Sequence, residues 1–490
     1  MSQALPALLA LLQLGLWLLL LAASLHLLRL GLWAWRRPLA PLPLPPLPEA
    51  ELPMVTVQLP LRNERYVARR AMLAAAALHW PADRLEIQVL DDSDDDTRDI
   101  VDATAVELRE AGHLIRVLRR PDRRGFKAGA LDAALPLAFG NLVAVLDADF
   151  VPAPDFLRQL VPLFARDAQL AFAQGRWSFL NESENLLTRV QALILHGLML
   201  VEQPYLTAHQ KPVQFNGTGG IWRKSVLVAA GGWQGGGTAS VTEDMDLSYR
   251  ACLLGYHGRH LPEVAVPTEL PATMAAFRIQ QQRWVRGGAQ VLRSLFGKLR
   301  GGQLPASERL TLLAHLLRHV RQPYLALALL WLPLATLTVG QLRPTFAPPG
   351  GLASALLALV LAVTVYYGAA LRRLGRSPRS ALLLGPLLLP LSMGLAVGLT
   401  AALVRGLFSS RAGAEFIRTP KTGGKSSAAS YRPAADRLAR LEVILGLGYV
   451  GLAGLAVSRG ELWAALGLGG LVAAGLLWVG VGSTWRTARL

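Results

Sequence analysis

Long apolar runs alternate with segments of mixed polarity and divide this chain into membrane-like and globular parts. Residues 4–28 are rich in leucine and almost uncharged, and as a helix they are long enough to cross about 30 Å of hydrocarbon. A cleaved signal peptide fits less well, because no basic residue precedes the run and the run is too long. We therefore predict a membrane anchor over residues 1–37 and a stiff, proline-rich linker over residues 38–50.

Residues 51–300 have the pattern of a globular α/β domain. Helical stretches such as 66–79 and 97–111 alternate with short apolar runs, which predicts a mainly parallel sheet covered by helices. About 250 residues are sufficient for a hydrophobic core of their own. The predicted strands are residues 55–59, 85–90, 114–118, 142–146 and 170–173.

After residue 300 the chain becomes apolar again. The apolar runs are residues 323–341, 352–371, 380–404, 441–457 and 461–481. The loops 372–379 and 405–440 are both basic, which predicts that both are cytoplasmic. The run between them must then cross the membrane either not at all or twice. Because glycines and prolines interrupt it, we predict that residues 380–404 are interfacial or re-entrant, which leaves five spans.

These runs predict three parts after the globular domain. Residues 301–408 would hold two spans and interfacial helices, residues 409–440 a cytoplasmic loop, and residues 441–490 a membrane hairpin. The composition agrees with a membrane protein, since 52% of the residues are hydrophobic and only 17% are charged. The net charge of +17 could indicate nucleic-acid binding, but the basic residues mostly flank apolar runs. We therefore expect a membrane partner and no nucleic acid.

Acidic residues follow two of the predicted strands. Asp91 and Asp92 end one strand, and Asp147 and Asp149 follow another. Open α/β sheets bind nucleotides at the carboxyl ends of their strands, so both pairs are candidate ligand sites. A calcium-binding EF-hand loop starting at Asp91 is excluded, because the sixth and twelfth positions are not Gly and Glu. The second pair could bind a hard divalent cation that bridges to phosphate oxygens. The single cysteine, Cys252, excludes an intramolecular disulfide and a cysteine-based zinc site.

Two further polar clusters lie on predicted helices. The segment Thr242–Asp244 begins one helix, and taken alone it is most simply an N-terminal cap. Gln280, Arg283 and Trp284 lie on a helix at about residues 272–296. A surface charge and a core or interfacial tryptophan would explain that second cluster equally well. Neither cluster therefore identifies a site by itself.

In this order, the four clusters resemble the processive membrane branch of the family 2 glycosyltransferases, which includes cellulose synthase. The similarity extends toward the plant cellulose-synthase-like mannan and glucan synthases and covers about residues 52–300. It runs through Trp80-Pro81, Gln88–Ser93, Phe126–Ala130, Asp147–Phe150, Phe215–Thr218, Gly231–Trp233 and Thr242–Asp246. The segment Phe416–Lys421 resembles the gating loop of cellulose synthase, with Arg418 in place of the family's valine.

The resemblance implies a role for each motif. Asp244 would be the catalytic base, with Glu243, Gln280, Arg283 and Trp284 beside it. Nucleotide-sugar binding would fall to Asp91, Asp92, Lys127, Asp147, Arg283, Thr419 and Lys421. Acceptor binding would fall to Trp284, Asn216, Gly217 and Thr218. Asp147 and Asp149 would bind Mg²⁺ or Mn²⁺.

The resemblance also implies a fold and a function. We expect an α/β nucleotide-sugar-binding domain of GT-A type, joined to an α-helical transmembrane region with about five spans and interfacial helices. The expected reaction is inverting transfer of a hexose from UDP-glucose or GDP-mannose to a growing β-glycan, processive and coupled to extrusion across the membrane. We expect a multi-pass protein of a bacterial-type inner (plasma) membrane, with its catalytic domain in the cytoplasm.

Two alternatives to a polymer synthase stay open. A glycolipid glucosyltransferase would share the same four motifs and add one or two sugars to a diacylglycerol or ceramide-type lipid. The gating-loop-like segment Phe416–Lys421 and the paired spans around it favour the polymer. A sugar-binding transporter or receptor would need no catalytic base, so the assembled motifs argue against it.

Overall fold

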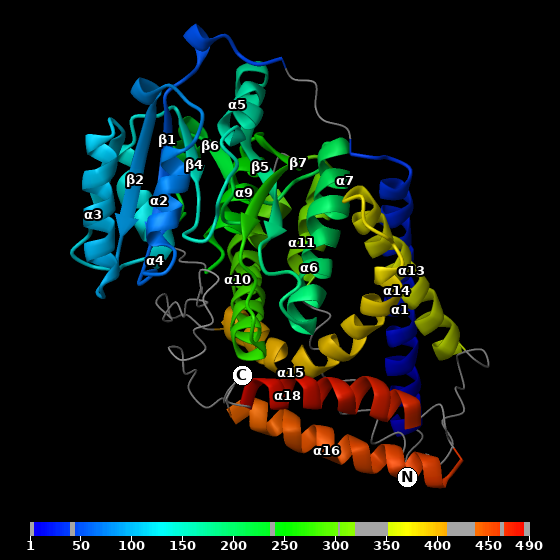
Figure 1. The fold of residues 1–490 in the computed structure, drawn as a ribbon. Coiled ribbons are helices and arrows are strands. Elements are labelled where there is room, and N and C mark those ends of the chain that lie inside the picture. Colours follow the sequence, from blue (N-terminus) through cyan, green and yellow to red (C-terminus); the bar gives the residue numbers. More distant parts are fainter. Residues whose placement is uncertain are drawn as a thin grey trace.

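The computed structural model describes residues 4–39, 45–235, 241–301, 304–318, 351–408, 437–460 and 465–484 (Figure 1). An α/β domain is built around one sheet, and long apolar helices lie beside and beneath it in Figure 1. The gating-like segment Phe416–Lys421 and the apolar run 323–341 lie outside the described residues. The predictions for them therefore stay predictions.

The sheet has seven strands in the order β3-β2-β1-β4-β6-β5-β7. The first four strands along the chain pair in parallel, as the sequence predicted, whereas β6 runs antiparallel to both β4 and β5. The strands are β1 (Val55–Leu61), β2 (Leu85–Asp91), β3 (Leu114–Leu118), β4 (Leu142–Val145), β5 (Leu170–Phe179), β6 (Gly220–Arg223) and β7 (His257–Thr268). All five predicted strands are present, and β6 and β7 are additional to them.

Helices cover both faces of the sheet. One face packs on α2 (Ala68–Ala76), α3 (Thr97–Glu110) and α5 (Phe156–Arg166), and the other on α4 (Phe126–Ala134), α8 (Lys224–Ala229) and α9 (Glu243–Leu253). The remaining helices of this part are α6 (Leu186–Gly197), α7 (Gln203–Ala208), α10 (Met274–Gly301) and α11 (Ala306–Leu317). A π-helical turn over Leu198–Glu202 joins α6 to α7.

Buried polar side chains in the central strands are paired with one another. Thr56 Oγ1 donates a hydrogen bond of 2.7 Å to Glu86, and Gln58 Nε2 donates one of 3.0 Å to Gln88. Arg116 on β3 completes the group with a 3.0 Å ion pair to Glu86. Because a buried polar group without a partner is costly, these pairings favour the observed register of β1, β2 and β3.

The apolar runs that the structure describes form helices of different lengths. They are α1 (Ala4–Trp35), α13 (Gly351–Arg373), α14 (Ser380–Leu384), α15 (Leu388–Phe408), α16 (Arg437–Ser458), a π-helix (Leu466–Ala473) and α18 (Ala474–Thr484). Among the described residues, three helices are long and apolar enough to cross a membrane, at residues 17–35, 380–408 and 437–458. The second of these is the run predicted to be interfacial. Length and composition alone would let it span, so its interfacial position stays a prediction.

Glycines allow these helices to pack at very short range. A Cβ atom on Gly31 of α1 would lie 2.8 Å from the Tyr366 Cα atom of α13. A Cβ atom on Gly475 of α18 would lie 2.0 Å from the carbonyl oxygen of Pro390 in α15. Small residues at such crossings are typical of helices that associate inside membranes.

Candidate active site

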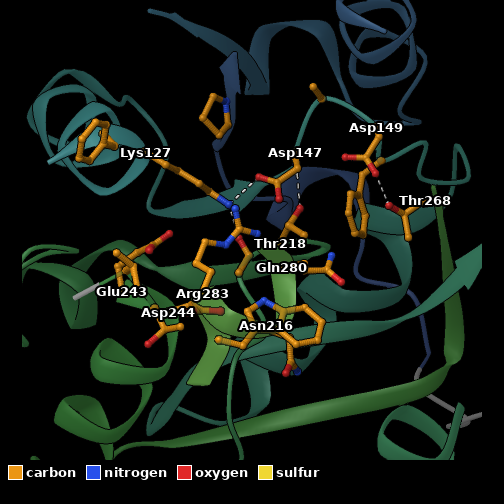
Figure 2. Close-up of a pocket in the computed structure, with 18 of the residues that line it drawn as sticks. Lys127, Asp147, Asp149, Asn216, Thr218, Glu243, Asp244, Thr268, Gln280 and Arg283 are labelled. Carbon is orange, nitrogen blue, oxygen red and sulfur yellow. Dashed lines mark hydrogen bonds and ion pairs between the residues drawn. The ribbon is translucent and has the colours of Figure 1, made fainter. Parts of the chain in front are cut away.

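A cavity of about 480 Å³ lies at the carboxyl ends of β1, β2 and β4. Loops after these strands form one side of it, and the start of α9 and the middle of α10 form the other. Figure 2 shows acidic and basic side chains from these elements turned toward a common space. The position matches the one at which open α/β sheets bind nucleotides.

The two aspartates after β2 lie in different places, one in the protein interior and the other at the cavity. Asp91 is buried, where it accepts hydrogen bonds from Arg119 Nε at 2.8 Å and from the Ser93 amide at 3.0 Å, and it does not line the cavity. Asp92 does line the cavity, and its two carboxylate oxygens lie 3.1 and 2.5 Å from Arg120. Of the two residues predicted to bind the nucleotide, Asp92 is therefore the one within reach of a ligand.

Lys127 and Asp147 form an ion pair at the centre of the cavity. Lys127 Nζ lies 2.5 Å from Asp147 Oδ1 and donates a second hydrogen bond of 2.9 Å to the Gly217 carbonyl (Figure 2). The Asp147 amide donates to Thr218 Oγ1 at 2.8 Å, which fixes the backbone at this point. Burial alone would lower the pKa of Lys127, but the carboxylates around it, above all Asp147, raise that pKa above its ordinary value. Lys127 is therefore held as a cation.

Asp149 is buried and held by the end of β7. Its Oδ2 accepts hydrogen bonds from Thr268 Oγ1 at 2.5 Å and from the Glu269 amide at 3.2 Å. Glu269 in turn forms a 2.8 Å ion pair with Arg70 on α2. Asp147 and Asp149 thus leave strand β4 with different partners, although both line the same cavity.

The loop before β6 brings the backbone close to the start of α9. Gly217 has φ of +79°, and a Cβ atom there would lie 3.2 Å from Asp244 Oδ2, so glycine suits both the backbone and the space. On one side of it, Asn216 Nδ2 donates to Gln174 Oε1 at 3.0 Å. On the other side, Gln174 Nε2 donates to the Thr218 carbonyl at 2.8 Å. Gln174 is buried, and its two hydrogen bonds hold the segment from Asn216 to Thr218 in place.

Glu243 and Asp244 open helix α9 at the cavity wall. Thr242 is the N-cap residue, but its side chain does not cap the helix, so a simple N-terminal cap does not account for this motif. Burial and the adjacent carboxylate of Glu243 raise the pKa of Asp244 to about 7, against the opposing effect of Lys127. Burial also raises the pKa of Glu243. A carboxylate with a pKa near 7 is suited to accept a proton at neutral pH.

Helix α10 contributes Gln280, Arg283 and Trp284 to the cavity. Figure 2 shows Arg283 reaching toward Lys127 and Asp147. Burial lowers the pKa of Arg283, and the nearby carboxylates, led by Glu243, oppose that effect. Trp284 packs beside a small apolar cluster of Ala192, Leu195 and Leu270 while it lines the cavity.

Nearly every predicted site residue in the described part of the chain lines this cavity, and Asp91 is the exception. Thr419 and Lys421 lie outside the described residues. The sequence did not predict Thr268 or Gln174, which hold Asp149 and Asn216, nor Arg318, which lines the cavity and donates a 2.6 Å hydrogen bond to Gln214. Thr268 ends strand β7, which the sequence did not predict, so no signal in the sequence singled it out.

Among the described residues, no group of three or more His, Cys, Asp or Glu side chains is arranged to hold a metal ion. Asp147 and Asp149 nevertheless present two carboxylates to one cavity, and the Asp147 side chain is 34% exposed. Mg²⁺ and Mn²⁺ usually combine one or two protein carboxylates with phosphate oxygens and water. The two aspartates fit such a site.

Comparisons with known proteins agree with this geometry. The model of glycosyl transferase family 2 matches residues 56–225, and that of glycosyl transferase family group 2 matches residues 142–371. A probable glucomannan 4-beta-mannosyltransferase 3 from rice is 42% identical over 247 residues, which are 50% of this chain and 44% of that protein. Glucomannan 4-beta-mannosyltransferase 2 from Arabidopsis thaliana is 42% identical over 253 residues, 51% of this chain and 47% of that protein.

A mannosyltransferase from Pyrobaculum calidifontis, solved with GDP-mannose and Mn²⁺, has a similar structure. The two chains are 21% identical with a TM-score of 0.55, and the match covers 82% of this chain and 100% of the other. That likeness confirms the GT-A-type α/β fold. The present chain spans about half the length of the curated relatives it matches. By its family models and relatives, the chain belongs to the family 2 glycosyltransferases, in their cellulose-synthase-like branch.

Proposed function

We propose that the chain is a membrane-embedded inverting glycosyltransferase that adds hexose units from a nucleotide sugar to a growing β-glycan. One observation carries the proposal: a single cavity joins a raised-pKa carboxylate, Asp244, to the Lys127–Asp147 ion pair and to Arg283. A proton acceptor and two cations are the groups that displacement of a nucleoside diphosphate from a sugar requires.

In the proposed reaction the acceptor hydroxyl loses its proton to Asp244. The acceptor oxygen forms a bond to the anomeric carbon while the bond from that carbon to the diphosphate oxygen breaks. The electron pair of the broken bond leaves with the diphosphate, so the anomeric configuration inverts in one step. Because the pKa of Asp244 is about 7, the base is available at neutral pH without a second activating group.

The leaving diphosphate gains negative charge, which Lys127 and Arg283 are placed to offset. Both cations are largely withdrawn from water at the cavity wall, where electrostatic stabilisation is stronger than in solution. Seven acidic and five basic side chains line the cavity, so an anionic donor meets a net negative surface. A divalent cation held by Asp147 and Asp149 would neutralise that excess negative charge and supply a Lewis acid for the diphosphate.

Other cavity residues would bind the nucleoside of the donor and the acceptor sugar. We propose that Asp92, held by Arg120, contacts the nucleoside, since it lines the cavity and Asp91 does not. Trp284 would offer an aromatic face to the acceptor sugar, and Asn216 a polar contact beside it. Thr218 is buried, and we propose that it acts through Asp147 rather than by touching the acceptor.

Two comparisons support GDP-mannose as the donor and a mannan-type polymer as the product. Relatives that are 42% identical are described as glucomannan 4-beta-mannosyltransferases, and the Pyrobaculum calidifontis neighbour was solved with GDP-mannose and Mn²⁺. The apolar helices support a membrane location. We further propose that synthesis is processive and coupled to extrusion of the product. The protein would lie in the plasma membrane with its catalytic domain in the cytoplasm.

The test is a transfer assay in purified membranes that contain the full chain. Labelled GDP-mannose and UDP-glucose are supplied separately, each with Mn²⁺, and the products are partitioned between ethanol-insoluble material and a chloroform phase. We expect ethanol-insoluble label from GDP-mannose that a β-mannanase degrades. Label confined to the chloroform phase would replace the polymer by a glycolipid product. Absence of transfer from both donors, with Asp244→Asn membranes as the background, would refute the proposal.

A further inference from the structure

Helix α10 presents two different faces to the rest of the protein. Its cavity face consists of Gln280, Arg283 and Trp284, which line the candidate active site. Successive residues of an α-helix are rotated by about 100°, so Arg278 lies about 200° away from Gln280. Arg278 therefore belongs to the opposite face, where Arg278 itself lies against Gly398 of α15 and the adjacent Phe277 shares a buried cluster with residues of α15 and α18. Figure 1 shows α10 running from the sheet down to these helices.

A buried ion pair joins this opposite face to the C-terminal membrane helices. Arg278 Nη1 lies 2.6 Å from Glu442 Oε2 in the second turn of α16. The two side chains are only 3% and 0% exposed. Transfer of two charges out of water is costly, and ionisable residues in membrane segments commonly have a functional reason. Stability alone is therefore a weak explanation for this pair.

The surroundings of the pair are tightly packed and mostly apolar. Met274, Phe277 and Val285 of α10 share one buried cluster with Leu395 and Leu399 of α15. Contacts between apolar side chains have little directional preference, so they do not by themselves fix how a helix is rotated. A charge-assisted hydrogen bond at 2.6 Å has a defined direction and supplies that constraint.

Glycines bring α15 close to the same region. A Cβ atom on Gly398 would lie 3.2 Å from Arg278 Nη2 and 3.0 Å from Gln282 Nε2. About two turns further along both helices, a Cβ atom on Gly406 would lie 2.5 Å from the carbonyl oxygen of Arg286. Helix α10 is thus seated directly against the backbone of α15, and a shift of either helix would be transmitted to the other.

We propose that the Arg278–Glu442 ion pair is a positioning contact, which fixes the rotation and axial register of α10 relative to α16. Through α10 it would hold Arg283 and Trp284 of the cavity face at their working distance from Asp244. The inference rests on the proposed glycosyl transfer. It adds that the C-terminal membrane helices are part of the catalytic apparatus, although neither Arg278 nor Glu442 lines the cavity.

Glu442→Gln in the full chain, assayed in membranes with the labelled donor, is the first variant. We expect kcat to fall by about tenfold to a hundredfold, because a displacement of about 1 Å caused by a distant substitution can cost about 10²-fold in rate. GDP affinity should fall by much less than kcat, because Asp92 and Lys127, which do not lie on α10, still line the donor site. Parallel loss of GDP affinity and kcat would indicate a general folding role and overturn the proposal.

Loss of one partner could also prevent folding, so a paired replacement is needed. In Arg278→Met combined with Glu442→Leu, both charges are removed and the volume is approximately kept, and such replacements of buried ion pairs are often neutral or stabilising. We expect a folded protein that binds GDP and has reduced kcat. Wild-type kcat in this double variant would overturn the proposal.

Charge reversal provides the rescue experiment. Arg278→Glu combined with Glu442→Arg should recover kcat well above that of Glu442→Gln, and equal loss in both would overturn the proposal. Glu107→Gln is the matched control, since it breaks the exposed 2.5 Å pair with Arg69 and should leave kcat unchanged. Failure of the wild type to use any nucleotide sugar would refute the proposed function itself, which separates the two questions.

Discussion

The raised pKa of Asp244 predicts a specific pH dependence for glycosyl transfer. Burial and the neighbouring Glu243 carboxylate raise this pKa to about 7. The carboxyl is then protonated below about pH 7 and cannot accept the acceptor's proton. For a base with this pKa, the deprotonated fraction rises about tenfold between about pH 6 and pH 8, and kcat should rise by the same factor. An aspartate with an ordinary pKa of about 3.9 would give a flat profile over this range.

Two substitutions separate the base from its surroundings. Glu243→Gln removes the neighbouring negative charge, which lowers the pKa of Asp244 and moves the acidic limb of the profile to lower pH. Asp244→Asn removes the base, so kcat should fall by at least about 10²- to 10⁴-fold and the limb should disappear. Both variants keep Lys127 and Arg283, and with them the groups proposed to hold the diphosphate.

Initial rates of label transfer at saturating donor, measured between about pH 5.5 and 9, test this reasoning. GDP binding at each pH is the control, because it reports folding and donor-site integrity independently of proton transfer. A wild-type kcat that does not change between about pH 6 and 8 would refute the assignment of a pKa near 7 to the base. Wild-type turnover by Asp244→Asn would refute the assignment of the base itself.

Asp149→Ala, or EDTA added to the wild type, should lower transfer by at least about 100-fold, and full activity under either condition would contradict the metal role. Asp92→Ala should weaken GDP binding by about tenfold to a hundredfold in calorimetry. Asp91→Ala should instead lower the melting temperature, because it removes the acceptor of the buried Ser93 amide. Gly475→Val should cost about 1–3 kcal/mol of unfolding free energy, whereas Gly448→Val, with no atom within 4 Å of its Cβ, should not.

Short apolar runs between helical stretches predicted β1 to β5 but not the other two strands of the sheet, β6 and β7. Strand β6, Gly220–Arg223, has only two apolar side chains, Ile221 and Trp222, so it does not form an apolar run like that of β4. Strand β7, His257–Thr268, is long, but two prolines and the charged residues Arg259 and Glu263 interrupt its pattern. Both strands form because of contacts with distant residues, which local sequence does not report.

The motifs predicted which segments meet in the cavity, but not which of two neighbouring side chains faces the cavity and which faces the protein interior. Successive side chains in an extended segment point to opposite sides, so Asp91 and Asp92 could not both face a ligand. The sequence gives no reason to choose between them. In the structure Arg119 forms an ion pair with the buried Asp91. Arg120 forms one with Asp92, at the cavity. Those arginines lie after β3, a different strand, and only the sheet order brings them to this edge.

The change in composition near residue 300 predicted a boundary between a catalytic and a membrane part, and packing continues across it. One buried cluster joins Val190 of α6, Phe277 of α10, Leu395 of α15 and Val479 of α18. A protein cut at residue 300 would expose the apolar face of α10 and lose the partners that fix its rotation. Since the same helix carries Arg283 on its other face, we expect the α/β domain and the apolar helices to act together, so that transfer activity requires both.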